Sequence, residues 1–165
     1  MRGFTLVELL VALTIVAIML TMGVPSYTYV IASNRMTGEL NMLIGDLQYA
    51  RSEAMKEGGN VQICASKDGA TCSGDSSSWQ GGWIVYSMAA SASGPLHVKQ
   101  AFSGSDTFSA NQSADHITFN REGFPQGLPA TGVTFSLGST AQSQSLTRCL
   151  TISIVGQITT PGSCT

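Results

Sequence analysis

The first eight residues combine a small residue, an aromatic residue and a lone carboxylate at the start of an apolar run. Gly3 precedes Phe4, and the chain stays predominantly apolar to Val24, with Glu8 as the one charged residue in that run. An ordinary secretory signal is cut after its apolar region. Here the plausible cleavage point, between Gly3 and Phe4, comes before it. A peptidase acting there would leave the apolar segment on the mature chain.

The apolar run is long enough to cross a lipid bilayer as a helix. Residues 4–24 would extend about 31 Å at 1.5 Å per residue. A carboxylate such as Glu8 costs about 2.5–3.5 kcal/mol at the bilayer centre and less near an end. Glu8 could therefore snorkel from the helix start to the interface. Arg2 before the run predicts a cytoplasmic N-terminus, with the rest of the chain across the membrane.

This arrangement of Gly3, Phe4 and Glu8 resembles the type III signal of prepilins, found in type IV pilins and in the pseudopilins of type II secretion. The resemblance implies a leader of residues 1–3, removal by a prepilin peptidase and N-methylation of Phe4. It also implies that Glu8, the fifth mature residue, is neutralised by the α-amino group of a neighbouring subunit. In that interpretation Glu8 is an assembly residue.

A second helical segment follows the apolar run. Pro25 removes a helix hydrogen bond and is expected to kink or locally melt the helix. We expect residues 4–27 to form the transmembrane and assembly helix and residues 28–57 an amphipathic continuation, ended by Gly58 and Gly59. One apolar stripe with 4-3 spacing marks the face that should pack on a head: Met36, Leu40, Leu43, Leu47, Ala50 and Ala54.

Residues 61–165 change to short β-type runs separated by Gly, Ser and Pro, with residues 104–114 expected to be a loop. Together with the helix they predict one α+β head over residues 28–165, in which the helix packs against an antiparallel sheet or small sandwich. The expected strands are Val61–Ala65, Trp83–Ser87, Leu96–Phe102, His116–Asn120, Val133–Leu137, Leu146–Val155 and a short Gln157–Thr159.

Four cysteines form two local groups, Cys64 with Cys72 and Cys149 with Cys164. Neither spacing fits a Cys-x-x-Cys metal or redox motif, and an even count outside the cytosol indicates disulfides. Three pairings are compatible with four cysteines. We expect the two local pairs, because they need the least folding of the chain.

The residue pattern favours no enzyme, metal site or cofactor. No Ser occupies a Gly-x-Ser-x-Gly elbow, and the glycines between Trp79 and Trp83 lack the Lys of a phosphate loop. His97 and His116 have no Cys, Asp or Glu at ligand-like spacing, so we interpret them as sheet residues. We expect Trp83 in the core and Trp79 packed in a loop.

Motifs in the expected head narrow the resemblance. They resemble, in the same order, those of the FimT/FimU minor pilins and the related H pseudopilin, GspH. The motifs lie at residues 47–54, 61–64, 82–86, 117–123 and 148–152.

The resemblance implies a non-enzymatic minor pilin that helps to initiate a type IV pilus and is built into it. Its implied partners are a prepilin peptidase, other minor pilins, the major pilin and the inner-membrane assembly platform. The chain would stay in the inner membrane as a single pass, with a periplasmic head, before it joins the pilus. An H pseudopilin of type II secretion and a DNA-uptake pilin are the alternatives. A secreted hydrolase with an uncleaved anchor is a third, but no catalytic group supports it.

Some FimT-like pilins bind DNA through Gly-Arg-x-Arg near the C-terminus. Here the corresponding residues are Gly156-Gln157-Ile158-Thr159, and Arg148 is the only charged side chain from Phe124 to Thr165. Capture of a phosphate backbone needs several cations. With a net charge of −2, the chain is expected to bind DNA weakly or not at all.

Overall fold

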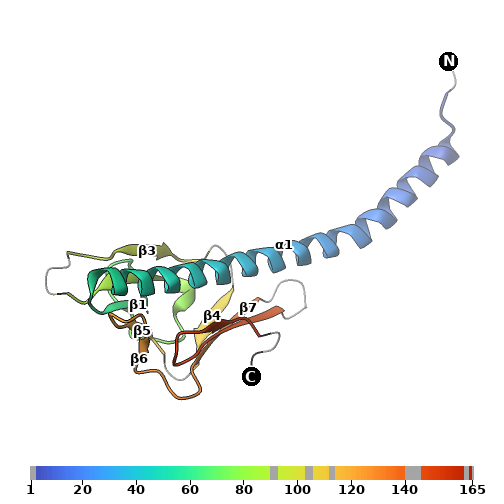
Figure 1. The fold of residues 1–165 in the computed structure, drawn as a ribbon. Coiled ribbons are helices and arrows are strands. Elements are labelled where there is room, and N and C mark those ends of the chain that lie inside the picture. The colour runs from blue at the N-terminus through green and yellow to red at the C-terminus, as the bar shows by residue number, and fades with distance from the viewer. Residues whose placement is uncertain are drawn as a thin grey trace.

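One helix, α1 (Leu6–Glu57), forms most of the N-terminal part of the computed structural model. The structure describes residues 3–89, 93–102, 106–111, 114–139, 146–161 and 164, and only the backbone of residues 22–26. α1 begins after the N-cap Thr5 and ends at Gly58, whose φ of 65° is the left-handed conformation that glycine adopts readily. Figure 1 shows α1 as a long, gently curved rod whose first part projects away from the head.

The second part of α1 buries the predicted apolar stripe. All six stripe residues are at most 4% exposed, and all but Leu40 are completely buried. The 4-3 spacing places these side chains on one face of the helix, where the head covers them. This prediction from the sequence is confirmed.

In the part of the chain that the structure describes, nine strands and one short 3₁₀ helix, η1, follow α1. The first sheet is antiparallel with the order β3-β2-β1-β5-β6, and the second has the order β4-β7-β8-β9. Their bounds are β1 Val61–Ala65, η1 Trp79–Gly81, β2 Gly82–Ser87, β3 His97–Gln100, β4 Thr107–Ala110, β5 His116–Phe119, β6 Pro125–Gln126, β7 Val133–Ser139, β8 Leu146–Ile152 and β9 Ile158–Thr159.

α1 contacts strands of both sheets, so helix and sheets enclose one core. Figure 1 shows the C-terminal half of α1 lying along the head. Aromatic residues fill the centre of the core. Trp79 is completely buried, packs edge-on against Phe135 at 4.9 Å between ring centroids and donates its indole N–H to the carbonyl of Ala114. Trp79 is thus a core residue, in contrast to the loop position that the sequence suggested.

The α+β class is confirmed, and three strands differ from expectation. β6 was not expected and pairs with β5. β4 lies inside the segment expected to be a loop, because it pairs with β7 through a register that includes Phe108 opposite Leu137. The expected strand at 146–155 ends at Ile152, where a turn over Ser153–Gly156 leads into β9.

Candidate assembly site

The residues at the predicted cleavage point precede the helix. Gly3 and Phe4 are not helical, and Phe4 is 81% exposed. Thr5 caps α1, and its hydroxyl accepts a hydrogen bond from the backbone N–H of Glu8 at 3.3 Å. The Gly3–Phe4 peptide bond therefore lies in exposed, non-helical chain, where cleavage by a peptidase is favoured. Met1 and Arg2 of the predicted leader lie outside the described residues.

Glu8 lies in the first turn of α1, exposed to solvent. A carboxylate there interacts favourably with the positive end of the helix dipole. Among the described residues it has no ion-pair partner, so its charge is available to a cation of another molecule. Thr5 and Glu8 have the Thr-x-x-Glu spacing of a capping box. This spacing is a signal for the helix start that was not used in predicting where the helix begins.

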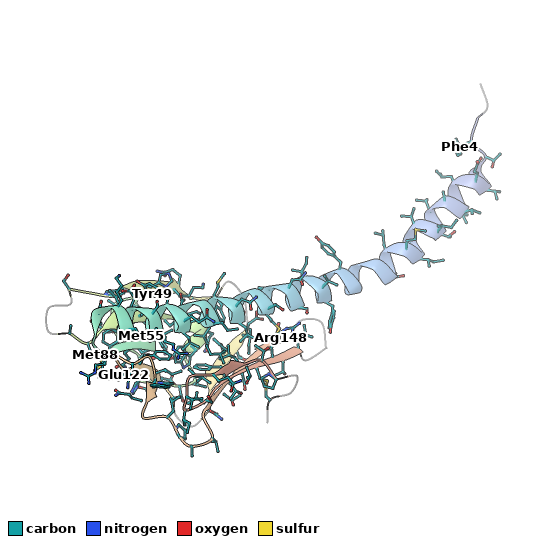
Figure 2. The ribbon with its side chains drawn as sticks, viewed as in Figure 1. Phe4, Tyr49, Met55, Met88, Glu122 and Arg148 are labelled. Carbon is teal, nitrogen blue, oxygen red and sulfur yellow. A yellow bond between two sulfur atoms is a disulfide. The ribbon has the colours of Figure 1, made fainter. Side chains whose placement is uncertain are left out.

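Large apolar side chains surround the first part of α1 and are not covered by the chain itself. Figure 2 shows them standing out from the projecting helix on several sides. Their exposed fractions lie between 49% and 81%. They are Phe4, Leu6, Val7, Leu9, Leu10, Val11, Leu13, Ile15, Val16, Ile18, Met19 and Leu20.

Within the described residues, no helix combines the length and the apolar character needed to cross a membrane. The helix is continuous through Pro25, where a kink or local melting was expected. The side chains of residues 22–26 lie outside the described part of the chain, so the predicted role of the Pro25 ring stays a prediction.

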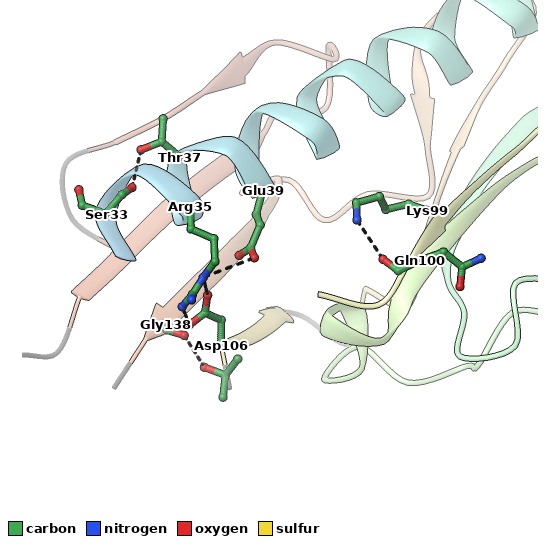
Figure 3. Close-up of polar contacts among 9 residues, drawn as sticks. Ser33, Arg35, Thr37, Glu39, Lys99, Gln100, Asp106 and Gly138 are labelled. Atoms are coloured by element: carbon green, nitrogen blue, oxygen red, sulfur yellow. Dashed lines mark hydrogen bonds and ion pairs between the residues drawn. The ribbon is translucent and has the colours of Figure 1, made fainter. Parts of the chain in front are cut away.

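An ion-pair cluster fastens the second part of α1 to the head (Figure 3). Arg35 donates two hydrogen bonds to the carboxylate of Asp106, at 2.8 and 2.7 Å, and the Asp106 side chain is completely buried just before β4. Glu39 lies one turn further along α1, 3.9 Å from Arg35. Burial, and next the charge of Asp106, raise the pKa of Glu39. The contact with Asp106 could not be predicted from the sequence, because Asp106 is 71 residues away from Arg35 in the chain.

Two disulfides close local loops of the head. Cys64 on β1 is bonded to Cys72, with a Cα–Cα distance of 5.6 Å. Cys149 on β8 is bonded to Cys164, with a Cα–Cα distance of 5.4 Å, so the C-terminal tail is tied back to the second sheet. These are the two local pairs among the three pairings that the sequence allowed.

The two histidines do not meet. His97 lies on β3 and His116 on β5, and β2 and β1 separate these strands in the sheet. Each has an aspartate beside it: His97 Nδ1 is 3.2 Å from Asp46, and His116 Nδ1 is 2.9 Å from Asp115. Asp46 also accepts the indole N–H of Trp83, so it ties α1 to β2 and β3.

A long N-terminal helix, uncovered at its first part and packed on an antiparallel β-head at its second, defines a type IV pilin-like protein. The sequence profile described as "Type II transport protein GspH" matches residues 39–156, and that of the "Prokaryotic N-terminal methylation motif" matches residues 1–24. The chain belongs to the GspH family, as a FimT/FimU-like type IV pilin related to GspH.

Two crystal forms of the type IV minor pilin FimU of Pseudomonas aeruginosa (strain PAO1) share this fold. One is 29% identical, with a TM-score of 0.58 over 81% of this chain and 98% of FimU. The other is 30% identical, with a TM-score of 0.52 over 79% and 98%. No significant match was found among curated proteins. The family and fold are those of structural pilin proteins.

Proposed function

We propose that this chain is a minor pilin that helps to initiate a type IV pilus and becomes part of it. The uncovered apolar part of α1, with one carboxylate in its first turn, is the observation that carries the proposal. Exposed apolar surface of this extent needs a lipid or protein environment. The likeness to the minor pilin FimU supports a filament as that environment.

In this proposal a prepilin peptidase cuts between Gly3 and Phe4 and Phe4 is N-methylated, in line with the methylation-motif match. Residues 4–27 hold the chain in the inner membrane, with the N-terminus cytoplasmic and the head periplasmic, until the assembly platform extracts it. Glu8 then pairs with the α-amino group of a neighbouring subunit. That pairing replaces the hydration that the carboxylate loses in an apolar filament core.

Replacing Glu8 tests the assembly step. Glu8→Ala should remain at wild-type level in the membrane fraction but disappear from sheared pili, and pilus counts should fall. Glu53→Ala is the matched control, because it removes a carboxylate from the part of α1 that packs on the head, where Glu53 pairs with Lys56. Incorporation of Glu8→Ala at the wild-type level would leave Glu8 as a snorkelling residue and contradict its assembly role.

An H pseudopilin of a type II secretion system is the second candidate, because the family profile carries that description. The same helix and Glu8 would then serve a short periplasmic filament. Deleting the gene separates the two functions. Loss of surface pili with normal exoprotein secretion supports the minor pilin, whereas normal pili with lost secretion supports the pseudopilin.

A further inference from the structure

One end of the head, where α1 finishes, carries an arginine that pairs with nothing in the described chain, surrounded by exposed apolar residues. We call this the distal face: Arg51, Met55, Phe124, Ile154 and Val155. Figure 2 labels Met55 at this end, opposite Phe4 at the start of the helix. The four apolar side chains are between 48% and 55% exposed.

Two β-hairpin turns, one from each sheet, form the floor of the distal face. The first joins β5 to β6 and is closed by the N–H of Gly123 donating to the carbonyl of Asn120 at 2.8 Å. The second joins β8 to β9 and is closed by the N–H of Gly156 donating to Ser153 at 2.8 Å. The turns touch, because a Cβ atom added at Gly156 would lie 3.2 Å from Cδ of Pro125.

The Arg51 side chain lies against both turns. A Cβ atom at Gly123 would lie 3.1 Å from Nε of Arg51, and one at Gly156 would lie 3.6 Å from its Nη1. Both glycines have left-handed φ angles, 79° and 77°, so the tight turns and the room for the guanidinium depend on them. Beside it is a cavity of about 140 Å³ lined by Leu47, Gln48, Arg51, Phe119, Gly156 and Ile158.

The residues at the turn tips are unusual for solvent-exposed turns. Ile154 and Val155 occupy the two central positions of the second turn, and Phe124 directly follows the first. Exposed turns favour Gly, Asn, Asp, Pro and Ser, since these residues suit the backbone and keep polar groups in water. Large apolar side chains around a half-buried arginine instead match the composition of a protein interface, in which aromatic residues, Met and Arg are enriched.

We propose that the distal face docks the head of a pilin-type subunit other than this chain and that Arg51 pairs there with a carboxylate of that subunit. This inference rests on the proposed function, which supplies neighbouring pilins. Charge complementarity selects the occupant: within the described residues Arg51 has no acidic partner, and its planar guanidinium suits a carboxylate. The apolar rim would exclude water from that pair and strengthen it.

A nucleic acid fits this face poorly. Arg121, on the same turn as Gly123, is already paired with Glu122 at 2.7 Å, which leaves Arg51 as the one uncompensated cation of the distal face. Phosphate-backbone binding sums many cation contacts, and the net charge of the chain is −2. The distal face, with one cation and an apolar rim, instead suits a partner that presents a carboxylate flanked by apolar side chains.

Site-specific photo-crosslinking in piliated cells tests the proposal with the full chain. A photoreactive amino acid replaces Val155, and sheared filaments are irradiated and analysed by mass spectrometry. We expect a crosslink to a head peptide of a pilin-type subunit that contains Asp or Glu. Arg51→Gln should reduce this product at least about tenfold, since truncating one member of a buried charge pair at an interface mainly speeds dissociation.

Arg121→Gln is the matched control, because it removes the same charge from the neighbouring turn and should leave the crosslink unchanged. Thermal unfolding of each purified variant reports whether the head is intact. If Arg51→Glu abolishes the crosslink, replacing the identified partner carboxylate with Arg should restore it. An unfolded Arg51→Gln head, or failure of this charge reversal, would contradict the pairing.

A crosslink that Arg51→Gln leaves unchanged would overturn the inference. So would a crosslink only to nucleic acid, one only to a second copy of this chain, or none at all while the chain is present in filaments. In each case the proposed function would stand. A wild-type chain that is missing from filaments would instead refute the proposed function, and the inference would fall with it.

Discussion

The two parts of α1 share one continuous backbone but differ in what covers their apolar side chains. In residues 6–21 and 27–31, large apolar residues are exposed, and Ile31 is still 46% exposed. From Ala32, which is 3% exposed, to Glu57 the apolar stripe is buried against both sheets. Ala32 is the first buried residue of α1 among those whose side chains are described.

The sequence pattern explains this difference. In the first part apolar residues occur on all sides of the helix, so one packed head cannot cover them. In the second part they recur at 4-3 spacing and leave the other face polar. The second part therefore belongs to the core of the head, whereas the first part needs other molecules. Stability should depend on one part and assembly on the other.

Placing a charged residue in one part of α1 or the other should show that the second part determines stability and the first part assembly. We expect the largest effect from the substitution in the part that packs on the head. Leu47 is completely buried, so Leu47→Asp should lower the free energy of unfolding by more than about 4 kcal/mol through lost packing and an unpaired buried charge. Thermal unfolding of the full chain in mild detergent, followed by circular dichroism, measures this loss.

Leu10→Asp is the matched variant, because Leu10 is 56% exposed. It should leave the unfolding temperature of the head unchanged but prevent recovery of the chain in sheared filaments. A lower unfolding temperature for Leu10→Asp, or its normal incorporation into filaments, would contradict the assignment of stability to the second part of α1 and of assembly to the first.

Local patterns predicted the elements whose packing follows from their own sequence. The apolar stripe from Met36 to Ala54 predicted the buried helix face. Alternating or continuous apolar runs predicted β1, β2 and β7. β4 was missed because Thr107–Ala110 lies in a segment rich in small and polar residues. Its strand conformation depends on pairing with β7, which is distant in the sequence.

The residues of the candidate site also fall into those that the sequence alone could identify and those that it could not. Gly3, Phe4 and Glu8 are neighbours in the chain, so the sequence alone could identify them. Contacts over long distances could not be identified, because folding brings their members together. Arg35 meets Asp106 across 71 residues, and Arg51 meets Gly156 only because two hairpins from different sheets end beside α1.

Removal of the tail disulfide should affect only the head. Replacing Cys149 and Cys164 together by Ser should cost about 3 kcal/mol of stability on the chain-entropy estimate for a loop of 15 residues. Denaturant unfolding of the oxidised proteins measures the loss. Peptide mapping without reduction should recover the Cys64–Cys72 and Cys149–Cys164 peptides as linked pairs, and crossed links would contradict the local pairing.

The smallest effect concerns the pH dependence set by Glu39. Burial and Asp106 raise its pKa in the folded state, while Arg35 and Lys99 oppose this rise. The folded state therefore holds the proton more tightly, so stability should fall as the pH rises from the unfolded pKa of about 4.5 through the folded pKa. Glu39→Gln should flatten this decline. An unchanged slope of unfolding free energy against pH would contradict it.

Mass spectrometry of this chain in sheared filaments tests most directly whether the uncovered part of α1 serves assembly. We expect a mature chain that lacks only Met1-Arg2-Gly3, begins with N-methylated Phe4 and retains the whole apolar segment. A mature N-terminus beyond Val24 would remove that segment and contradict the account. Absence of the chain from every filament fraction would contradict it as well.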